Sequence, residues 1–249
     1  MMATMAFVLA NRYVLSWLNF LSNMTILNSS LNRRAIDIFV ALLISNFVSV
    51  GFILMRVFAT GENEYFYLLW NLFLAWLPLI FTLELKLYLL KKFWLNWPGI
   101  LLTLLWLGFL PNSFYLAADL VHLQDMSKDN VLYDATMLAS FMFNGFVVGL
   151  ASVYFVHKEL LKRLRTTTAH ILIALTLLSS SFAIYLGRSL RWNTWDVIVN
   201  PAGILFDVSD RFINPGAHPQ AFVTTTTFFV LIGSVYLFVW QFIRALRKD

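Results

Sequence analysis

Six long apolar stretches of this sequence lack Asp, Glu, Lys and Arg, and each approaches or exceeds the length of a membrane-spanning helix. The shortest covers residues 171–187 and the longest covers residues 93–118. A helix needs roughly 20 apolar residues to cross the hydrocarbon core of a bilayer. With only 12% of its residues charged, the chain has too few ionisable side chains to cover a water-soluble domain. The sequence therefore predicts an all-α polytopic transmembrane bundle of about six spans.

These stretches divide the chain into an N-terminal segment and one membrane domain. Residues 1–35 are expected to form an interfacial segment, because polar and apolar side chains recur there at helical spacing, and residues 36–249 to form the membrane domain. The predicted spans lie near residues 38–58, 65–83, 93–118, 135–156, 170–188 and 221–243. Within the fourth span, Gly145 and Gly149 form a small-residue pattern that predicts close packing of two helices, and packing inside the chain is favoured over dimerisation.

Lys and Arg are divided unequally between the two sides of these spans. Counted in alternate loops, one side holds 13 of the 18 basic residues and the other holds 5. Because short basic loops tend to stay in the cytoplasm, both termini are expected to be cytoplasmic. The loops at 119–134 and 188–220 then face outward. The net charge of +5 comes from Lys and Arg side chains beside the spans, which are expected to contact anionic headgroups of the lipid bilayer. No nucleic-acid partner is expected.

A stripe of polar residues follows Pro111, which is expected to break or restart the helix at the outward end of the third span. Asn112, Tyr115, Asp119 and His122 are spaced by three or four residues and so share one helix face. Asp119 and His122 are candidate catalytic residues or ligands of a divalent metal, and Asn112 and Tyr115 are candidate substrate contacts. In the alternative interpretation, the stripe marks the solvent end of the helix and its contacts with a neighbouring helix.

A second cluster of polar and aromatic residues follows the fifth span. Arg188 and Arg191 share a helix face and are candidates for binding the phosphate or carboxylate of a lipid-linked substrate. Trp192 and Trp195 are further candidate substrate contacts, and Asp196 is a candidate catalytic acid or metal ligand. In the alternative interpretation, an arginine neutralises the carboxylate of the third span and the tryptophans fix the depth of the helix in the membrane.

The sequence does not identify a cofactor, and a divalent metal is the one that its residues suggest. His218 opens the sixth span at the same membrane level as His122, and is a third candidate ligand for a divalent metal with Asp119; otherwise it is an exposed loop residue. The chain has no cysteine, which excludes disulfides, thiolate metal sites and a cysteine nucleophile. Walker, dinucleotide-binding, HExxH and GxSxG motifs are also missing, so the sequence does not support the chemistry that they carry.

Two stretches of the sequence resemble the motifs of a known family. Residues 110–122 read LPN-x-x-Y-x-x-x-D-x-x-H, and residues 187–196 read GR-x-x-RWN-x-WD. Both resemble domain-of-unknown-function family 1361, a group of bacterial multi-pass membrane proteins, and the likeness runs from the second span to the sixth. The resemblance implies a bacterial protein of the cytoplasmic (inner) membrane. Because the family has no agreed activity, the resemblance assigns no catalytic residue.

Three classes of function fit these residues. The first is an outward-facing membrane enzyme, a hydrolase or transferase, that acts on a lipid-linked or envelope substrate. The second is a transporter or channel that uses the polar stripe, although four of the spans lack charged residues at mid-depth. The third is a non-catalytic assembly or scaffold protein. The sequence specifies neither the substrate nor the oligomeric state.

Overall fold

The computed structural model describes residues 29–61, 63–120 and 131–246. The chain divides into two compact units, residues 1–48 and residues 49–249. Residues 1–28 of the predicted interfacial segment lie outside the described residues, and helix α2 begins at Ser29. The interfacial segment therefore stays a prediction. In the first unit, the described part of α2 exposes apolar side chains, and the Asn46 side chain donates to the carbonyl of Leu42.

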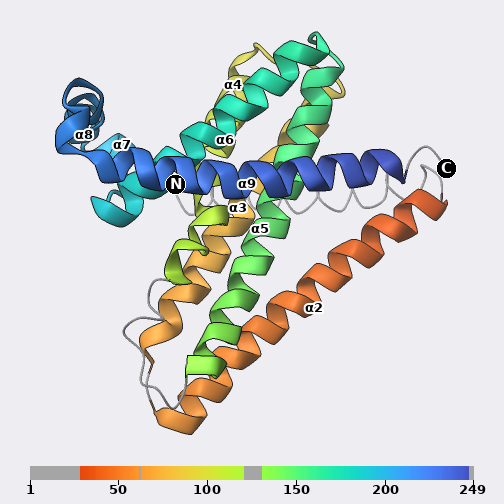
Figure 1. Ribbon diagram of the computed structural model, residues 1–249. Helices are drawn as coiled ribbons and strands as arrows, with labels where there is room; N and C mark the ends of the chain where they lie inside the picture. Colours follow the sequence, from red (N-terminus) through yellow and green to blue (C-terminus); the bar gives the residue numbers. More distant parts are fainter. Residues whose placement is uncertain (1–28, 62, 121–130, 247–249) are drawn as a thin grey trace, which may run out of the picture. The chain divides into compact units, whose positions relative to one another are not determined.

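Every regular element in the described ranges is helical, which confirms the all-α fold class (Figure 1). The elements are α2 (Ser29–Thr60), η1 (Glu64–Phe66), α3 (Tyr67–Leu89), α4 (Trp97–Tyr115), α5 (Val131–Leu161), α6 (Thr166–Ser189), α7 (Asp196–Val199), α8 (Pro201–Ile213), η3 (Pro215–Ala217) and α9 (Pro219–Ala245). Among the described residues, six segments are long and apolar enough to cross a membrane: Asp37–Thr60, Glu64–Leu89, Trp97–Leu120, Val131–Leu161, Thr166–Ser189 and Pro219–Ala245. Each of the six overlaps one predicted span, whereas the membrane side of the termini stays a prediction.

Several of these helices extend beyond the uncharged stretches from which the spans were predicted. Helix α5 takes in Asp134 near its beginning and Glu159 near its end, and both are buried. Glu159 forms ion pairs with Lys162 and Arg163, which follow one turn later. Because paired charges can remain at the end of a membrane helix, a search for uncharged residues alone underestimates the length of the helix.

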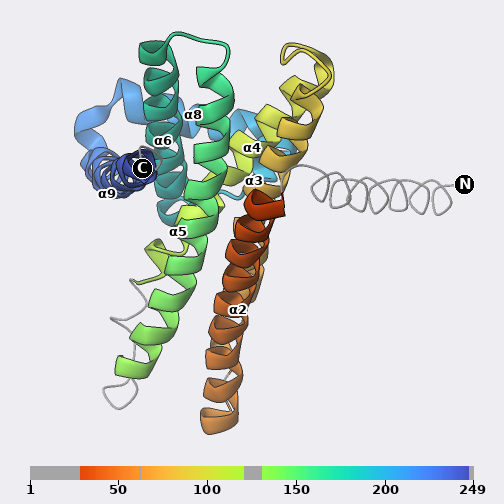
Figure 2. The same cartoon turned by 90° about the vertical axis from the view of Figure 1, so that its right-hand side faces the viewer.

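The second unit contains a bundle with α4 near its centre. Helix α3 packs against α4 and α5, α4 also contacts α6, and α6 packs against α9. Helix α9 crosses α6 at a wide angle, as Figures 1 and 2 both show. One buried apolar cluster joins α4, α5, α6 and α9 around Leu110 and Phe114. A second cluster joins the end of α2 to α3 and α5 around Leu68 and Phe141.

Close contact between α4 and α5 depends on two glycines of α5. A Cβ atom at Gly145 would lie 2.4 Å from the backbone oxygen of Ser113, and one at Gly149 would lie 2.7 Å from the Ser113 Cβ. Neither position has room for a side chain. The small-residue pattern therefore serves packing within the chain, as predicted.

A buried ion pair joins the end of α2 to the beginning of α5. Arg56 Nε donates to Asp134 Oδ1 over 2.8 Å, and Arg56 Nη2 lies 3.3 Å from Asp134 Oδ2. The Tyr65 hydroxyl donates to the same carboxylate over 3.4 Å. Both charged side chains are less than a tenth exposed, so each compensates the desolvation of the other.

Candidate functional site

A cavity of about 620 Å³ lies at one end of helices α3, α4 and α6. The lining comes from the first half of α3, the second halves of α4 and α6, and the segment that follows α6. Its polar side chains include Tyr67, Asn71, Asn112, Tyr115, Asp119 and Ser180. Since α3 begins where α4 and α6 end, all of these groups lie towards one side of the membrane. This is the side that the distribution of Lys and Arg predicts to be outward.

Asp119 is the buried carboxylate of this cavity. It lies in a short turn just after α4, and the residue is only 4% exposed. Asn71 Nδ2 donates to Asp119 Oδ2 over 3.3 Å. No cation forms an ion pair with Asp119 among the residues that the structure describes. A buried carboxylate with so little compensation is costly unless a proton, a cation or a ligand group neutralises it.

Helix α4 continues through Pro111 to Tyr115, so the expected break at the proline is wrong. Asn112 accordingly stays on the helix, and its Nδ2 donates to Phe109 O over 3.1 Å and to Thr194 Oγ1 over 3.2 Å. Asn112, Tyr115 and Asp119 all line the cavity, although Asp119 lies in the turn beyond the end of α4 and not on the helix itself. His122, the fourth residue of the stripe, lies outside the described residues.

Tyr115 lies against the end of α6, where Gly187 allows the close approach. A Cβ atom at Gly187 would lie 3.3 Å from Tyr115 Cε2 and 3.4 Å from the carbonyl oxygen of Trp192. Glycine therefore lets the aromatic ring and the following segment pack on the same turn of α6. This contact joins the two sequence motifs in space.

Asn71 and Ser180 also line the cavity, although sequence reasoning did not single them out. Ser180 is 1% exposed, and its hydroxyl has no hydrogen-bond partner in the part of the chain that the structure describes. Both are polar residues inside long apolar spans, which is the signal that could have identified them. The sequence does not show which neighbouring helix the side chain of Asn71 or of Ser180 faces, so it could not place them in one site.

The structure separates the residues of the second cluster by position. Trp192 and Trp195 line the cavity, whereas Arg188 and Arg191 are exposed and are not part of its lining. Helix α6 ends at Ser189, so Arg191 lies beyond it and the prediction that the two arginines share a helix face is wrong. The arginines thus lie outside the cavity, where they add positive potential to its surroundings.

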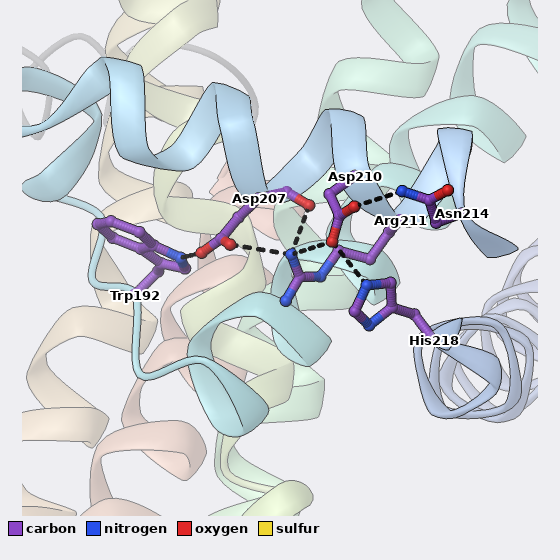
Figure 3. Close-up of polar contacts among 6 residues, drawn as sticks. All are labelled: Trp192, Asp207, Asp210, Arg211, Asn214 and His218. Carbon is purple, nitrogen blue, oxygen red and sulfur yellow. Dashed lines mark hydrogen bonds and ion pairs between the residues drawn. The ribbon is translucent and has the colours of Figure 1, made fainter. Parts of the chain in front are cut away.

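Asp196 and His218, two further candidates, have local partners. Asp196 Oδ2 accepts a hydrogen bond of 2.6 Å from the backbone N–H of Asn193 at the beginning of α7. His218 Nε2 lies 2.6 Å from Asp210 Oδ2 on α8 (Figure 3). In residues 29–61, 63–120 and 131–246, no group of three or more His, Asp or Glu side chains could hold a metal ion. A divalent metal at Asp119, His122 and His218 stays a prediction, because His122 lies outside these ranges.

A known protein family matches the part of the chain that contains most of this site. Residues 70–235 match a family described as protein of unknown function (DUF1361). The chain belongs to this family. Both motifs that resemble the family lie within the match, as do all the polar cavity residues named above except Tyr67. No curated protein and no solved structure matches the chain.

Proposed function

We propose that this chain is a membrane enzyme, a hydrolase or transferase, which binds the polar head of a lipid-linked substrate in the cavity and uses Asp119 for proton transfer. The observation that carries the proposal is a buried carboxylate, without an ion-pair partner among the described residues, that faces a cavity of about 620 Å³. Cavities of this size are typical of small-molecule sites. We place the protein in a bacterial cytoplasmic membrane with this site on the outward side.

The lining supports an amphipathic ligand in preference to a small polar one. Trp70 and Leu107 line the cavity and are exposed on the surfaces of α3 and α4, within membrane-capable segments. An apolar chain can therefore reach the cavity from the lipid. The polar head would meet Asp119, Asn71 and Ser180, whose side chains supply a carboxylate, an amide and a hydroxyl.

The same groups suggest how a reaction would be assisted. Asp119 would transfer a proton to a leaving oxygen or take one from an attacking hydroxyl, while Asn71 holds the carboxylate in place. The exposed Arg188 and Arg191 would attract an anionic head towards the cavity without lining it. A phosphate-bearing lipid matches this arrangement of charges.

Transport is less well supported by this geometry. The cavity lies at one end of α3, α4 and α6, and so it does not by itself provide a path across the membrane. A carrier would need further polar groups at mid-depth. We therefore favour binding and chemistry on one side of the membrane.

The test begins with ligand binding. The purified protein is placed in nanodiscs of total bacterial lipid, and native mass spectrometry records which lipids remain bound. Gly108→Leu should release the bound lipid, because a side chain at this lining residue projects into the cavity towards Thr194. Gly233→Leu is the matched control, since Gly233 lies on α9 with no atom within 4 Å of an added Cβ.

The chemical step is tested on the same lipid extract in ¹⁸O-labelled water. The wild type should convert one class of lipid, with ¹⁸O in the product if the enzyme is a hydrolase and without it if it is a transferase. Asp119→Asn should keep lipid binding and lose the conversion, while Asp37→Asn, at an exposed position on α2, should change neither. Bound lipid that the wild type leaves chemically unchanged would contradict the enzymatic proposal.

A further inference from the structure

Helix α8 has the reverse polarity of a helix on the surface of a water-soluble protein. Its outward face exposes four large apolar side chains, each 65–74% exposed: Leu205, Phe206, Phe212 and Ile213. Its opposite face turns charged residues towards the protein, and Arg211 is only 6% exposed (Figure 3). In water this arrangement would expose apolar surface and bury charge, both of which are unfavourable. The medium outside α8 is therefore expected to be apolar.

The apolar face of α8 continues onto the two neighbouring membrane helices. The ring of Phe212 lies 5.7 Å from that of Phe182 on α6 and 6.5 Å from that of Phe222 on α9, measured between centroids. The preceding short helix α7 adds the exposed side chains of Ile198 and Val199. One apolar surface thus runs from α6 across α8 to α9.

The connections of α8 place it at the membrane surface. Helix α6 ends at Ser189 and α9 begins at Pro219, and both helices are long and apolar enough to cross the membrane. Residues 190–218 therefore begin and end on the same side of the membrane. Amphipathic helices held in this way lie in the interface, with the apolar face in the boundary between headgroups and acyl chains.

The polar face of α8 is occupied by contacts within the protein. Asp207 Oδ2 accepts a hydrogen bond of 2.7 Å from Trp192 Nε1, and Asp207 Oδ1 accepts one of 2.9 Å from Arg211 Nη1. Arg211 Nη1 also lies 3.7 Å from Asp210 Oδ2, which contacts His218 (Figure 3). These contacts join α8 to the segment after α6 and to the beginning of α9.

This network also connects α8 to the cavity. Trp192 is part of the cavity lining, and a Cβ atom at Gly203 of α8 would lie 2.8 Å from Cη2 of its indole ring. The indole is thus held by a hydrogen bond at its nitrogen and by close packing at its far edge. A shift in the depth of α8 would move this part of the cavity wall.

We propose that α7 and α8 form a membrane-surface element whose apolar face is inserted among the lipids, and that this element holds Trp192 in the cavity wall. The bilayer is the expected occupant of this face, because the apolar surface is continuous with those of α6 and α9. The exposed Arg188 and Arg191 lie nearby in the sequence, where they can meet anionic headgroups. This inference rests on the membrane assignment and does not depend on the proposed catalysis.

The test uses single cysteines in the full chain, which has none of its own. A nitroxide is attached at Phe206→Cys on α8, and in a second variant at Val199→Cys on α7, in vesicles of phosphatidylethanolamine and phosphatidylglycerol. Gly216→Cys is the control, because Gly216 is exposed and an added Cβ there has no atom within 4 Å. Collision rates are measured with oxygen, which concentrates in lipid, and with a water-soluble nickel chelate.

Labels at positions 206 and 199 should show an oxygen-to-nickel collision ratio about five-fold above that at position 216, as expected for insertion below the headgroups. Ratios equal to that of the control would overturn the proposal, because the apolar side chains of α7 and α8 would then be in water. Protection of both labels from oxygen and nickel together would also overturn it, since a protein partner or a second copy of the chain would then cover the face.

Discussion

Two buried carboxylates at the same end of the bundle have very different surroundings. Asp134 is fully buried and accepts hydrogen bonds from Arg56 and Tyr65. Asp119 is 4% exposed, accepts a hydrogen bond from Asn71, and borders the cavity. The first charge is compensated by the fold, whereas the second faces space that a ligand can occupy. Burial alone therefore does not distinguish a structural carboxylate from a functional one, but compensation and an adjoining cavity do.

Removal of the structural carboxylate should have the largest effect on stability. Asp134→Ala removes the carboxylate from its buried ion pair with Arg56, and we expect a loss of about 3–5 kcal/mol in the free energy of unfolding. Thermal unfolding in detergent measures the loss as a lower Tm. The double variant Arg56→Met with Asp134→Leu removes both charges and should recover much of the stability. An unchanged Tm for Asp134→Ala would mean that the ion pair is not structural.

Substitution of the cavity carboxylate should affect activity and leave the fold intact. Asp119→Asn removes the proton-transfer group while keeping its shape, so we expect at least about a 100-fold loss in lipid conversion. The Tm should stay the same or rise, because a buried charge with little compensation is removed. A Tm loss as large as that of Asp134→Ala would show that the two carboxylates do not differ in role.

A substitution that crowds the contact between Gly187 and Tyr115 should have an effect of intermediate size, and we expect it on lipid affinity. Gly187→Ala places a Cβ atom 3.3 Å from the Tyr115 ring, and the ring must shift to accept it. We expect about a ten-fold loss in lipid affinity by native mass spectrometry, or about 1.4 kcal/mol. Gly233→Ala is the matched control, because Gly233 lies on α9 and an added Cβ there has no atom within 4 Å. Equal affinity in both variants would argue against a role for the Tyr115 position.

The smallest expected effect is the response of α8 to pH. Hydrogen bonds with Asn214 and His218 hold the pKa of Asp210 below its ordinary value of 3.8, with a further contribution from the charge of Arg211. The stabilisation from this carboxylate is therefore complete above its ordinary pKa and is lost as the pH falls through the lower pKa of the folded protein. A nitroxide at Phe206→Cys on α8 should become slightly more mobile in this acid range. In the Asp210→Asn background this acid-dependent change should disappear.

The identity and order of the membrane helices could be predicted from the sequence alone. Long uncharged apolar runs identify spans because each span must match the thickness of the hydrocarbon core, which is a local requirement on the chain. The spacing of Asn112, Tyr115 and Asp119 predicted one polar helix face, since helical periodicity is local, but α4 ends at Tyr115 and Asp119 reaches the cavity from the following turn. The continuation of α4 through Pro111 was not predicted, because packing against α3, α5 and α6 outweighs the local preference of proline.

Other features of the site depend on contacts between distant parts of the chain. Asn71 and Ser180 meet in one cavity only because α3 and α6 turn particular faces towards α4. The charge of Asp134 can be buried because Arg56, 78 positions away in the sequence, pairs with it. The sequence by itself determined the helices, their order and one polar face, because these follow from periodicity and hydrophobicity along the chain. Only the tertiary structure decided which polar side chains are compensated and which face a cavity, because compensation requires a partner brought close in space.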